Sequence, residues 1–185
     1  MIIREANAGD AASIARVLVD TWRTTYAGIV PQGYLNALSY EERTSVWQAR
    51  LSDSSKMRPG CFVIVAENDK SDVIGFAGGG PSQGYDLPFT GELDFIYLLK
   101  SYQRRGIGRQ LSATVALNLK QQGHKSMVLW VFSANPCRAF YETLAGRVVA
   151  ERIVNKCGGN LAQTAYGWEN LDVFEKVMKS DSASW

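Results

Sequence analysis

The sequence is poor in cysteine and histidine. It has 185 residues with three cysteines (Cys61, Cys137, Cys157) and one histidine, and the cysteines lie far apart with no CxxC pair. This pattern argues against a disulfide framework, predicts no metal site, and fits a chain that folds in a reducing cytosol. A nucleophilic cysteine needs an orienting base, and His124 has no second histidine beside it, so a Cys–His nucleophile is also disfavoured.

Long apolar runs and a surplus of charge are missing as well. No stretch approaches the roughly 18 apolar residues of a membrane span. The N-terminus carries Arg4, Glu5 and Asp10 where a signal peptide would be apolar. We therefore expect a cytoplasmic protein with no membrane partner. The 20 basic and 18 acidic residues give a net charge of +2, which is too mild to indicate nucleic-acid binding, so any basic site must be local.

Hydrophobic periodicity predicts one mixed α/β domain over residues 1–185, with its core in 1–168 and a tail in 169–185. Helical patterns occur at 11–27 (with Asp10 as the expected N-cap), 40–51, 106–122 and 135–144, and strand patterns at 2–6, 61–67, 72–80, 91–99, 126–132, 147–155 and 161–168. The expected order is β-α-α-β-β-β-α-β-α-β-β. The tail is expected to fray, with a helical turn or more. The tail also contains apolar residues that could dock on a second copy of the chain, which gives the hypothesis of a homodimer: Val173, Phe174, Val177 and Met178.

Three arginines and two glycines meet in the stretch YQRRGIGRQL, where the apolar run at 91–99 ends and a helical pattern begins. A helix N-terminus has unpaired amides and a partial positive charge, and glycines let an anion approach the main chain. Arginines at 104, 105 and 109 add charge-assisted donors. The stretch therefore predicts a phosphate site that is neither a Walker A loop nor a Rossmann fingerprint. The alternative is a solvated basic loop with a glycine turn.

The same stretch closely resembles the acetyl-CoA-binding motif of the GNAT superfamily of N-acetyltransferases. The motif core, [QR]xxGx[GA] directly after the fourth strand, is matched by residues 103–108. A second family motif is similar to NPCRAFYETLAGRVV (135–149) in Asn135, Ala139, Phe140, Tyr141 and Gly146. The resemblance implies a GNAT-type acyl-CoA N-acyltransferase fold, a mixed, mostly antiparallel sheet of about seven strands with helices on both faces. It also implies acetyl-CoA as cosubstrate, with no metal.

The resemblance also assigns the coenzyme site. Main-chain groups of Ile96 and Leu98 would contact the coenzyme, and the Leu98 amide would donate to the oxyanion of the reaction. Asn135 resembles the residue that bonds the pantetheine amide, although it is equally suited to cap a helix. The remaining coenzyme contacts implied by the two motifs are Gln103, Arg104, Arg105, Gly106, Ile107, Gly108, Arg109, Arg138 and Tyr141.

Candidate acid and base residues follow from the same comparison. Glu92 lies at the offset before Gln103 where the histone-acetylating branch of the family has its catalytic glutamate. Asp94 lies two residues further on, on the same face of the expected strand, where it would attract a cationic amine. Tyr141 takes the position at which the family protonates the coenzyme sulfur. The alternatives are two carboxylates at a wet strand end and an ordinary core aromatic.

Three aromatic residues, Trp22, Tyr26 and Trp130, resemble the substrate-side wall of the family, although such a stripe is more often core. The leading hypothesis is transfer of an acetyl group to a primary amine of a small molecule or peptide, by direct attack in a ternary complex. The alternative is a GNAT-like module that senses acyl-CoA or another ligand without turnover. A sensor needs the phosphate loop but neither Glu92 nor Tyr141.

Overall fold

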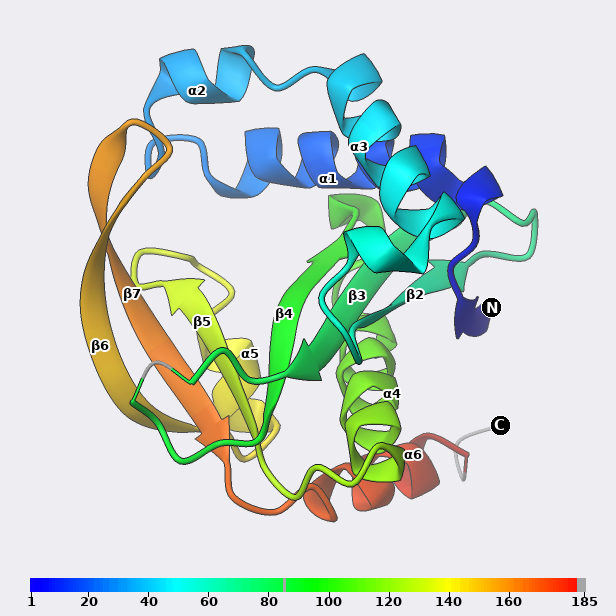
Figure 1. Cartoon of the computed structure of the whole chain (residues 1–185), viewed down its shortest axis with the longest axis vertical. Coiled ribbons are helices and arrows are strands. Elements are labelled where there is room, and N and C mark those ends of the chain that lie inside the picture. The colour runs from blue at the N-terminus through cyan, green and yellow to red at the C-terminus, as the bar shows by residue number, and fades with distance from the viewer. Residues whose placement is uncertain (85, 183–185) are drawn as a thin grey trace.

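Seven strands form one sheet in the computed structural model, which describes residues 1–84 and 86–182, with only the backbone for 178–182. The sheet order is β1-β2-β3-β4-β5-β7-β6, and every neighbouring pair is antiparallel except β4 and β5 (Figure 1). The strands are β1 (Ile2–Glu5), β2 (Phe62–Glu67), β3 (Val73–Pro81), β4 (Gly91–Leu98), β5 (Met127–Phe132), β6 (Arg147–Lys156) and β7 (Gly159–Trp168). The predicted strand set and the mixed, mostly antiparallel sheet are confirmed.

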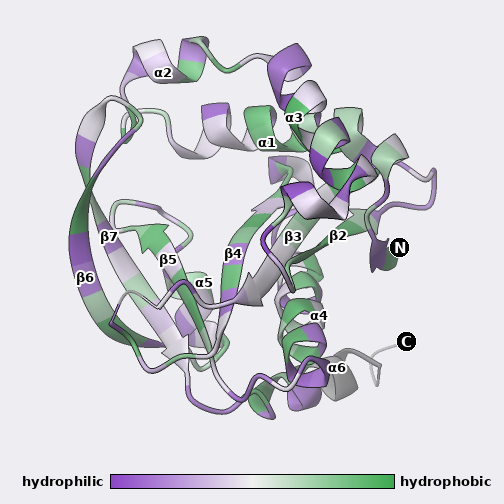
Figure 2. Cartoon of the chain, in the orientation of Figure 1, coloured by the Kyte–Doolittle hydropathy of each residue, from purple (hydrophilic) through white to green (hydrophobic). Residues whose placement is uncertain are grey.

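Helices cover both faces of this sheet, as expected. They are α1 (Ala11–Thr25), α2 (Gln32–Asn36), α3 (Tyr40–Ser52), α4 (Ile107–Gln121), α5 (Ala139–Thr143) and α6 (Val173–Ser182). On one face, Ile14 of α1 and Trp47 of α3 belong to a buried cluster with Phe76 of β3. On the other face, Leu111 of α4 packs with Ala77 of β3. The apolar side of α4 faces the sheet because its buried residues recur at helical spacing (Figure 2).

The parallel pair β4 and β5 is joined over only two register positions, Gly91↔Met127 and Glu92↔Val128. Beyond them β4 continues along β3 with a bulge, because Leu93 lies opposite Gly79 and Phe95 opposite Gly78, which leaves Asp94 as the extra residue. The two strands therefore separate directly after Glu92. A gap opens in the middle of the sheet, and the bulge lies at its start.

Backbone amides of β4 face this gap. The amide of Leu99 donates to Ile74 O of β3 at 3.0 Å. Because successive residues of an antiparallel strand point their N–H groups to alternate sides, the N–H groups of Leu98 and Ile96 point away from β3. They point to the side from which β5 has departed.

The C-terminal segment contains the expected helical turns, in α6, but over the described residues it is docked on the core and not frayed. Phe174 is fully buried, and Val173 and Val177 pack against the same core cluster as α4. The Lys120 ammonium of α4 bonds Asp172 at 2.5 Å and Glu175 at 2.6 Å. Three of the four apolar residues suggested for pairing with a second copy are therefore packed within the chain. The Met178 side chain and residues 183–185 lie outside the described part.

Three local predictions are also corrected. Asp10 occupies the N-cap position of α1, as expected, but its side chain makes no capping bond: its carboxylate accepts from the Arg4 guanidinium and from the Asn7 amide, each at 2.8 Å. Helix α2 was not predicted, because its five residues are too few to show a period. The helix expected at 135–144 is regular only over Ala139–Thr143, because the Asn135 side chain first accepts from the Cys137 amide at 2.8 Å and forms a turn.

None of the helices in the described ranges, 1–84 and 86–182, combines the length and the apolarity that crossing a membrane requires.

Candidate active site

The loop before α4 presents free backbone amides. Gly106 has φ of 81°, in the left-handed region that favours glycine, and ends the loop directly before Ile107, the first residue of α4. The first helical bond runs from the Gln110 amide to Gly106 O at 3.1 Å. Within residues 1–84 and 86–182, the amides at positions 106–109 have no acceptor. Unpaired amides at the positive end of a helix dipole are suited to bind an anion.

Three arginines stand around these amides. Within the described ranges none of Arg104, Arg105 and Arg109 lies within ion-pair distance of a carboxylate. The Arg105 guanidinium lies 5.4 Å from the centre of the Tyr102 ring. Arg104 has φ of 63°, an unusual backbone conformation for a residue with a side chain. The loop thus combines unpaired cations with unpaired amides, as a phosphate site requires.

Two neighbours of the loop have supporting positions. The Gln103 side-chain amide donates to Leu98 O at 3.1 Å, so it ties the loop to the end of β4. The Ile107 side chain is buried in the core, which leaves only its main chain available to a ligand. Gln103 and Ile107 therefore hold the loop against the open side of β4.

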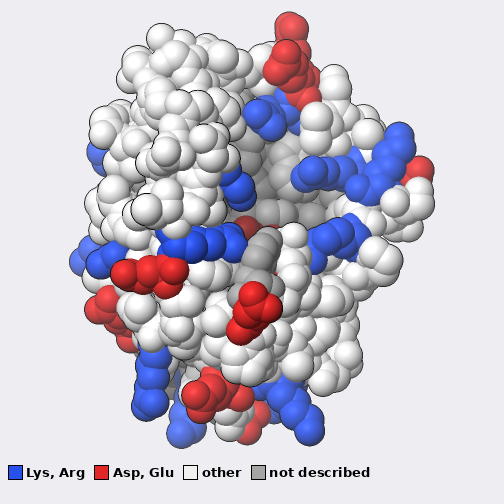
Figure 3. Space-filling view, turned by 60° about the vertical axis from the view of Figure 1, so that its left-hand side comes forward, with Lys and Arg blue, Asp and Glu red and all other residues white. Residues whose placement is uncertain are grey.

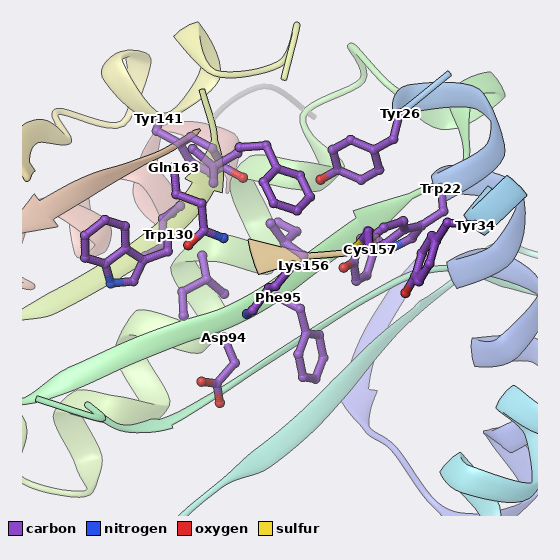
Figure 4. A pocket seen from close by; sticks show the side chains of 16 residues that line it. Trp22, Tyr26, Tyr34, Asp94, Phe95, Trp130, Tyr141, Lys156, Cys157 and Gln163 are labelled. Carbon is purple, nitrogen blue, oxygen red and sulfur yellow. The ribbon is translucent and has the colours of Figure 1, made fainter. Parts of the chain in front are cut away.

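A cavity of about 350 Å³ lies in the region where β4 and β5 separate. Trp22, Tyr26, Trp130 and Tyr141 all line it, so the structure brings together the residues that the sequence suggested for a substrate wall and for an acid (Figure 4). The rings of Trp22 and Tyr26 lie 4.8 Å apart, centre to centre. The aromatic pair on α1 therefore forms one wall of a cavity.

Tyr141 is held in place by its neighbours. Its ring centre lies 5.3 Å from that of Phe140 and 5.5 Å from that of Tyr166. Burial raises the pKa of Tyr141 well above the ordinary value of a phenol. The hydroxyl group therefore keeps its proton at neutral pH and is available as a donor.

A second cavity of about 570 Å³ contains both candidate carboxylates. Glu92 is 5% exposed, and its Oε2 accepts from the Gln83 amide at 3.1 Å. Burial raises the pKa of Glu92, and the nearby charge of Asp94 raises it further. The Arg58 guanidinium holds Asp94 with two bonds, of 2.7 and 2.8 Å. Burial nevertheless raises the pKa of Asp94 above its ordinary value.

The two cavities share one boundary. Asp94, Phe95, Trp130, Lys156 and Gln163 line both of them. Glu92 lines only the larger cavity, and Tyr141 lines only the smaller one. The candidate base and the candidate acid therefore line different cavities, and the two cavities share a boundary.

Asn135 and Arg138, which were also expected to contact the coenzyme, do not line the smaller cavity. Asn135 is buried, its side-chain amide donates to the Tyr26 hydroxyl at 3.2 Å, and its oxygen accepts from the Cys137 amide. Asn135 therefore forms a turn with Cys137 and does not cap α5, whose N-cap residue is Arg138. The Arg138 guanidinium donates to Thr164 Oγ1 at 3.2 Å.

Sequence reasoning missed the residues that line the cavities from β6, β7 and the loop after α3. Arg58, Lys156 and Cys157 gave no signal, because each is an isolated polar or small residue in a loop or at a strand end. Gln163 did give a signal. It is a polar residue inside an apolar strand pattern, and in the structure it is buried and accepts from Arg152 Nε at 2.9 Å.

A sheet that separates after its fourth strand, together with a free-amide loop and a helix next to the gap, defines the class of protein. Residues 19–146 match the model of the acetyltransferase (GNAT) family. The chain belongs to this family and is an acetyltransferase.

Relatives and solved structures agree with this assignment. The uncharacterized N-acetyltransferase YuaI of Bacillus subtilis is 39% identical over 176 residues, which cover 95% of this chain and 97% of that protein. A probable N-acetyltransferase of Mycobacterium tuberculosis is 29% identical over 76% of each chain. The same fold occurs in YncA of Salmonella typhimurium with acetyl-CoA, at a TM-score of 0.67 and 24% identity over 93% of this chain and 94% of that one. It also occurs in the PaiA N-acetyltransferase of Thermoplasma acidophilum with coenzyme A, at a TM-score of 0.66 and 21% identity over 88% and 96%.

Within residues 1–84 and 86–182, no three His, Cys, Asp or Glu side chains gather as a metal site.

Proposed function

We propose that this chain transfers the acetyl group of acetyl-CoA to a primary amine by direct attack in a ternary complex. The observation that carries the proposal is the set of unpaired amides at 106–109, which lies next to the gap between β4 and β5. Solved structures of the same fold that contain acetyl-CoA or coenzyme A support it.

The residues present fit the coenzyme. The loop at 103–109 offers amides and guanidinium groups to a diphosphate. The N–H groups of Ile96 and Leu98 face the gap, where a pantetheine amide can replace the missing strand. When bound, acetyl-CoA supplies the activated acyl group. Its site would run along β4 from the loop to the boundary of the two cavities.

Each chemical demand of the transfer has a candidate residue. Glu92 accepts the proton of the attacking amine, directly or through a water molecule, and its raised pKa makes it a better base than an exposed carboxylate. The Leu98 amide donates to the oxygen that gains negative charge. The Tyr141 hydroxyl gives its proton to the departing sulfur. The amine would reach the boundary through the larger cavity, which contains Glu92.

The test is free-thiol release from acetyl-CoA by the purified chain, with amines of several classes. We expect release with at least one amine class and none without an amine, because attack is direct. If the chain binds acetyl-CoA but none of the amines causes thiol release, the sensing module becomes the better account.

Coenzyme affinity should depend on the arginine loop. Replacing Arg109 by Gln removes one charge beside the free amides, so we expect the dissociation constant of acetyl-CoA to rise about tenfold, the value of one charge-assisted bond. Calorimetry measures this change. Binding of S-acetylpantetheine, which has no diphosphate, should not change, and Lys70→Gln in the β2–β3 turn serves as the matched control. Equal weakening for both ligands would remove the loop from diphosphate binding.

A further inference from the structure

The larger cavity is strongly basic, although the chain as a whole is nearly neutral. Five cationic side chains line it, against the two carboxylates Glu92 and Asp94: Arg50, Lys56, Arg58, Arg152 and Lys156. The complete chain has a net charge of only +2. Figure 3 shows Lys and Arg side chains around a hollow on this face of the molecule. The charge is therefore concentrated where the acceptor amine would enter.

The cations come from two opposite walls. Arg50 belongs to the last turn of α3, and Lys56 and Arg58 belong to the segment that follows it. Arg152 and Lys156 belong to β6, which is the edge strand on the far side of β5 and β7 from β4 in the sheet order. The fold thus brings basic residues from distant parts of the chain to the two sides of one cavity.

Only part of this charge is used within the chain. Arg58 is paired with Asp94, and Arg152 bonds Gln163 and lies 3.8 Å from the centre of the Trp130 ring. Across the ranges 1–84 and 86–182, no carboxylate lies within ion-pair distance of Arg50, Lys56 or Lys156. These three side chains are thus cationic groups without an ionic partner at the rim of the cavity.

Lys156 has a special position among them. It is the last residue of β6 and lines both cavities, as Asp94 does (Figure 4). An amine at the boundary would therefore have a carboxylate and an ammonium group within the same lining. Groups of opposite charge on one ligand, an amine and an anion, match this arrangement.

We propose that the acceptor is a small amine that also carries an anionic group, a carboxylate or a phosphate, which Lys156 and the neighbouring rim cations bind. The proposal rests on the acetyl transfer proposed above and adds the class of the acceptor. Amines with a second positive charge, such as polyamines, would meet repulsion from the same cations. The aromatic side chains Trp47, Phe62 and Phe95 in the same lining offer apolar surface to the remainder of the molecule.

The experiment compares matched acceptors in the thiol-release assay. Phenylalanine, methionine and glutamate are each measured beside their α-carboxamides, phosphoethanolamine beside ethanolamine, and spermidine as the cationic member. We expect the anionic member of at least one pair to have a kcat/KM about tenfold or more above its neutral partner, because charge-assisted bonds exceed neutral ones. The two kinds of pair separate carboxylate from phosphate. The preference should shrink as salt is added, because the rim is exposed.

Lys156→Met tests the residue itself. We expect this change to lower kcat/KM for the preferred anionic acceptor about tenfold and to leave its neutral partner and acetyl-CoA affinity unchanged. Lys70→Met in the β2–β3 turn removes the same charge outside both cavities and should leave both acceptors unchanged. Lys56→Met, on the opposite wall, is the second variant and should reduce the same preference.

The outcomes are distinguishable. Turnover with neutral or cationic amines that equals or exceeds turnover with the anionic ones overturns the anionic-acceptor class and leaves acetyl transfer intact. A preference for anionic acceptors that Lys156→Met and Lys56→Met both leave unchanged overturns the role of the rim cations. No turnover with any amine, despite coenzyme binding, contradicts the acceptor class and the acetyl transfer together.

Discussion

Glu92→Gln is expected to lower kcat by about 10²- to 10⁴-fold, the usual contribution of a general base. The change retains the size of the side chain and an oxygen that can accept from the Gln83 amide. The fold and the coenzyme site should therefore be preserved. Steady-state thiol release measures the effect, with Glu151→Gln on the exposed side of β6 as the matched control. A kcat close to that of the unchanged protein would leave Glu92 as a buried structural carboxylate.

The pH profile gives Glu92 a second signature. Burial and the neighbouring Asp94 raise its pKa, whereas the hydrogen bond from the Gln83 amide and the charges of Arg58 and Arg152 oppose the rise. A base works only when it is deprotonated, so kcat should fall as the pH falls through this raised pKa, at a higher pH than for an exposed glutamate. Glu92→Gln should remove this acid limb. If Asp94→Asn removes it and Glu92→Gln does not, the base is Asp94, which lines both cavities.

Tyr141→Phe should have the second large effect, a loss of about 10²-fold or more in kcat, because the departing thiolate loses its proton donor. The ring contacts with Phe140 and Tyr166 remain, so folding should change little. A second thioester, whose leaving thiol is more acidic than coenzyme A, depends less on protonation of the sulfur. Its rate should therefore fall less in Tyr141→Phe than the rate with acetyl-CoA. Tyr40→Phe, on α3 and outside both cavities, is the matched control.

Two results would contradict this role: an equal loss of rate with acetyl-CoA and with the thioester of the more acidic thiol, or no loss of rate with either. Equal loss would indicate that Tyr141 positions the coenzyme without protonating sulfur. An unchanged rate would return Tyr141 to the interpretation as an ordinary core aromatic beside Phe140.

Elements with strong local periodicity were predictable from the sequence. The spacing of Ile14, Val17 and Trp22 requires no tertiary information to indicate a helix. The tail was misjudged because the helix there depends on a distant partner, since Phe174 becomes buried only when α6 lies on α4. The N-cap position of Asp10 was correct, but its side chain makes no capping bond because its carboxylate is paired with the Arg4 guanidinium, which local capping rules do not include.

The phosphate loop and the basic rim of the larger cavity also differ in how far the sequence could predict them. The phosphate loop is contiguous in sequence, so its glycines and arginines reveal its chemistry directly. The basic rim is assembled from α3, the segment after it and β6, and no spacing rule connects Lys56 with Lys156. Arg58, which holds Asp94, was hidden for the same reason. Such groupings depend on which strands become neighbours in the sheet.

The pairing of β4 with β5 over only two register positions also affects the stability of the folded chain against unfolding. Two halves of one sheet meet there through a ladder of two register positions, and beyond it no backbone pairing joins β4 to β5 within residues 1–84 and 86–182. A ligand bound between β4 and β5 would contact both halves of the sheet and hold them together. Mass action then links its concentration to resistance against unfolding, by about 2.7 kcal/mol at one hundred times its dissociation constant. The durability of this chain in a cell would accordingly follow the size of the acyl-CoA pool.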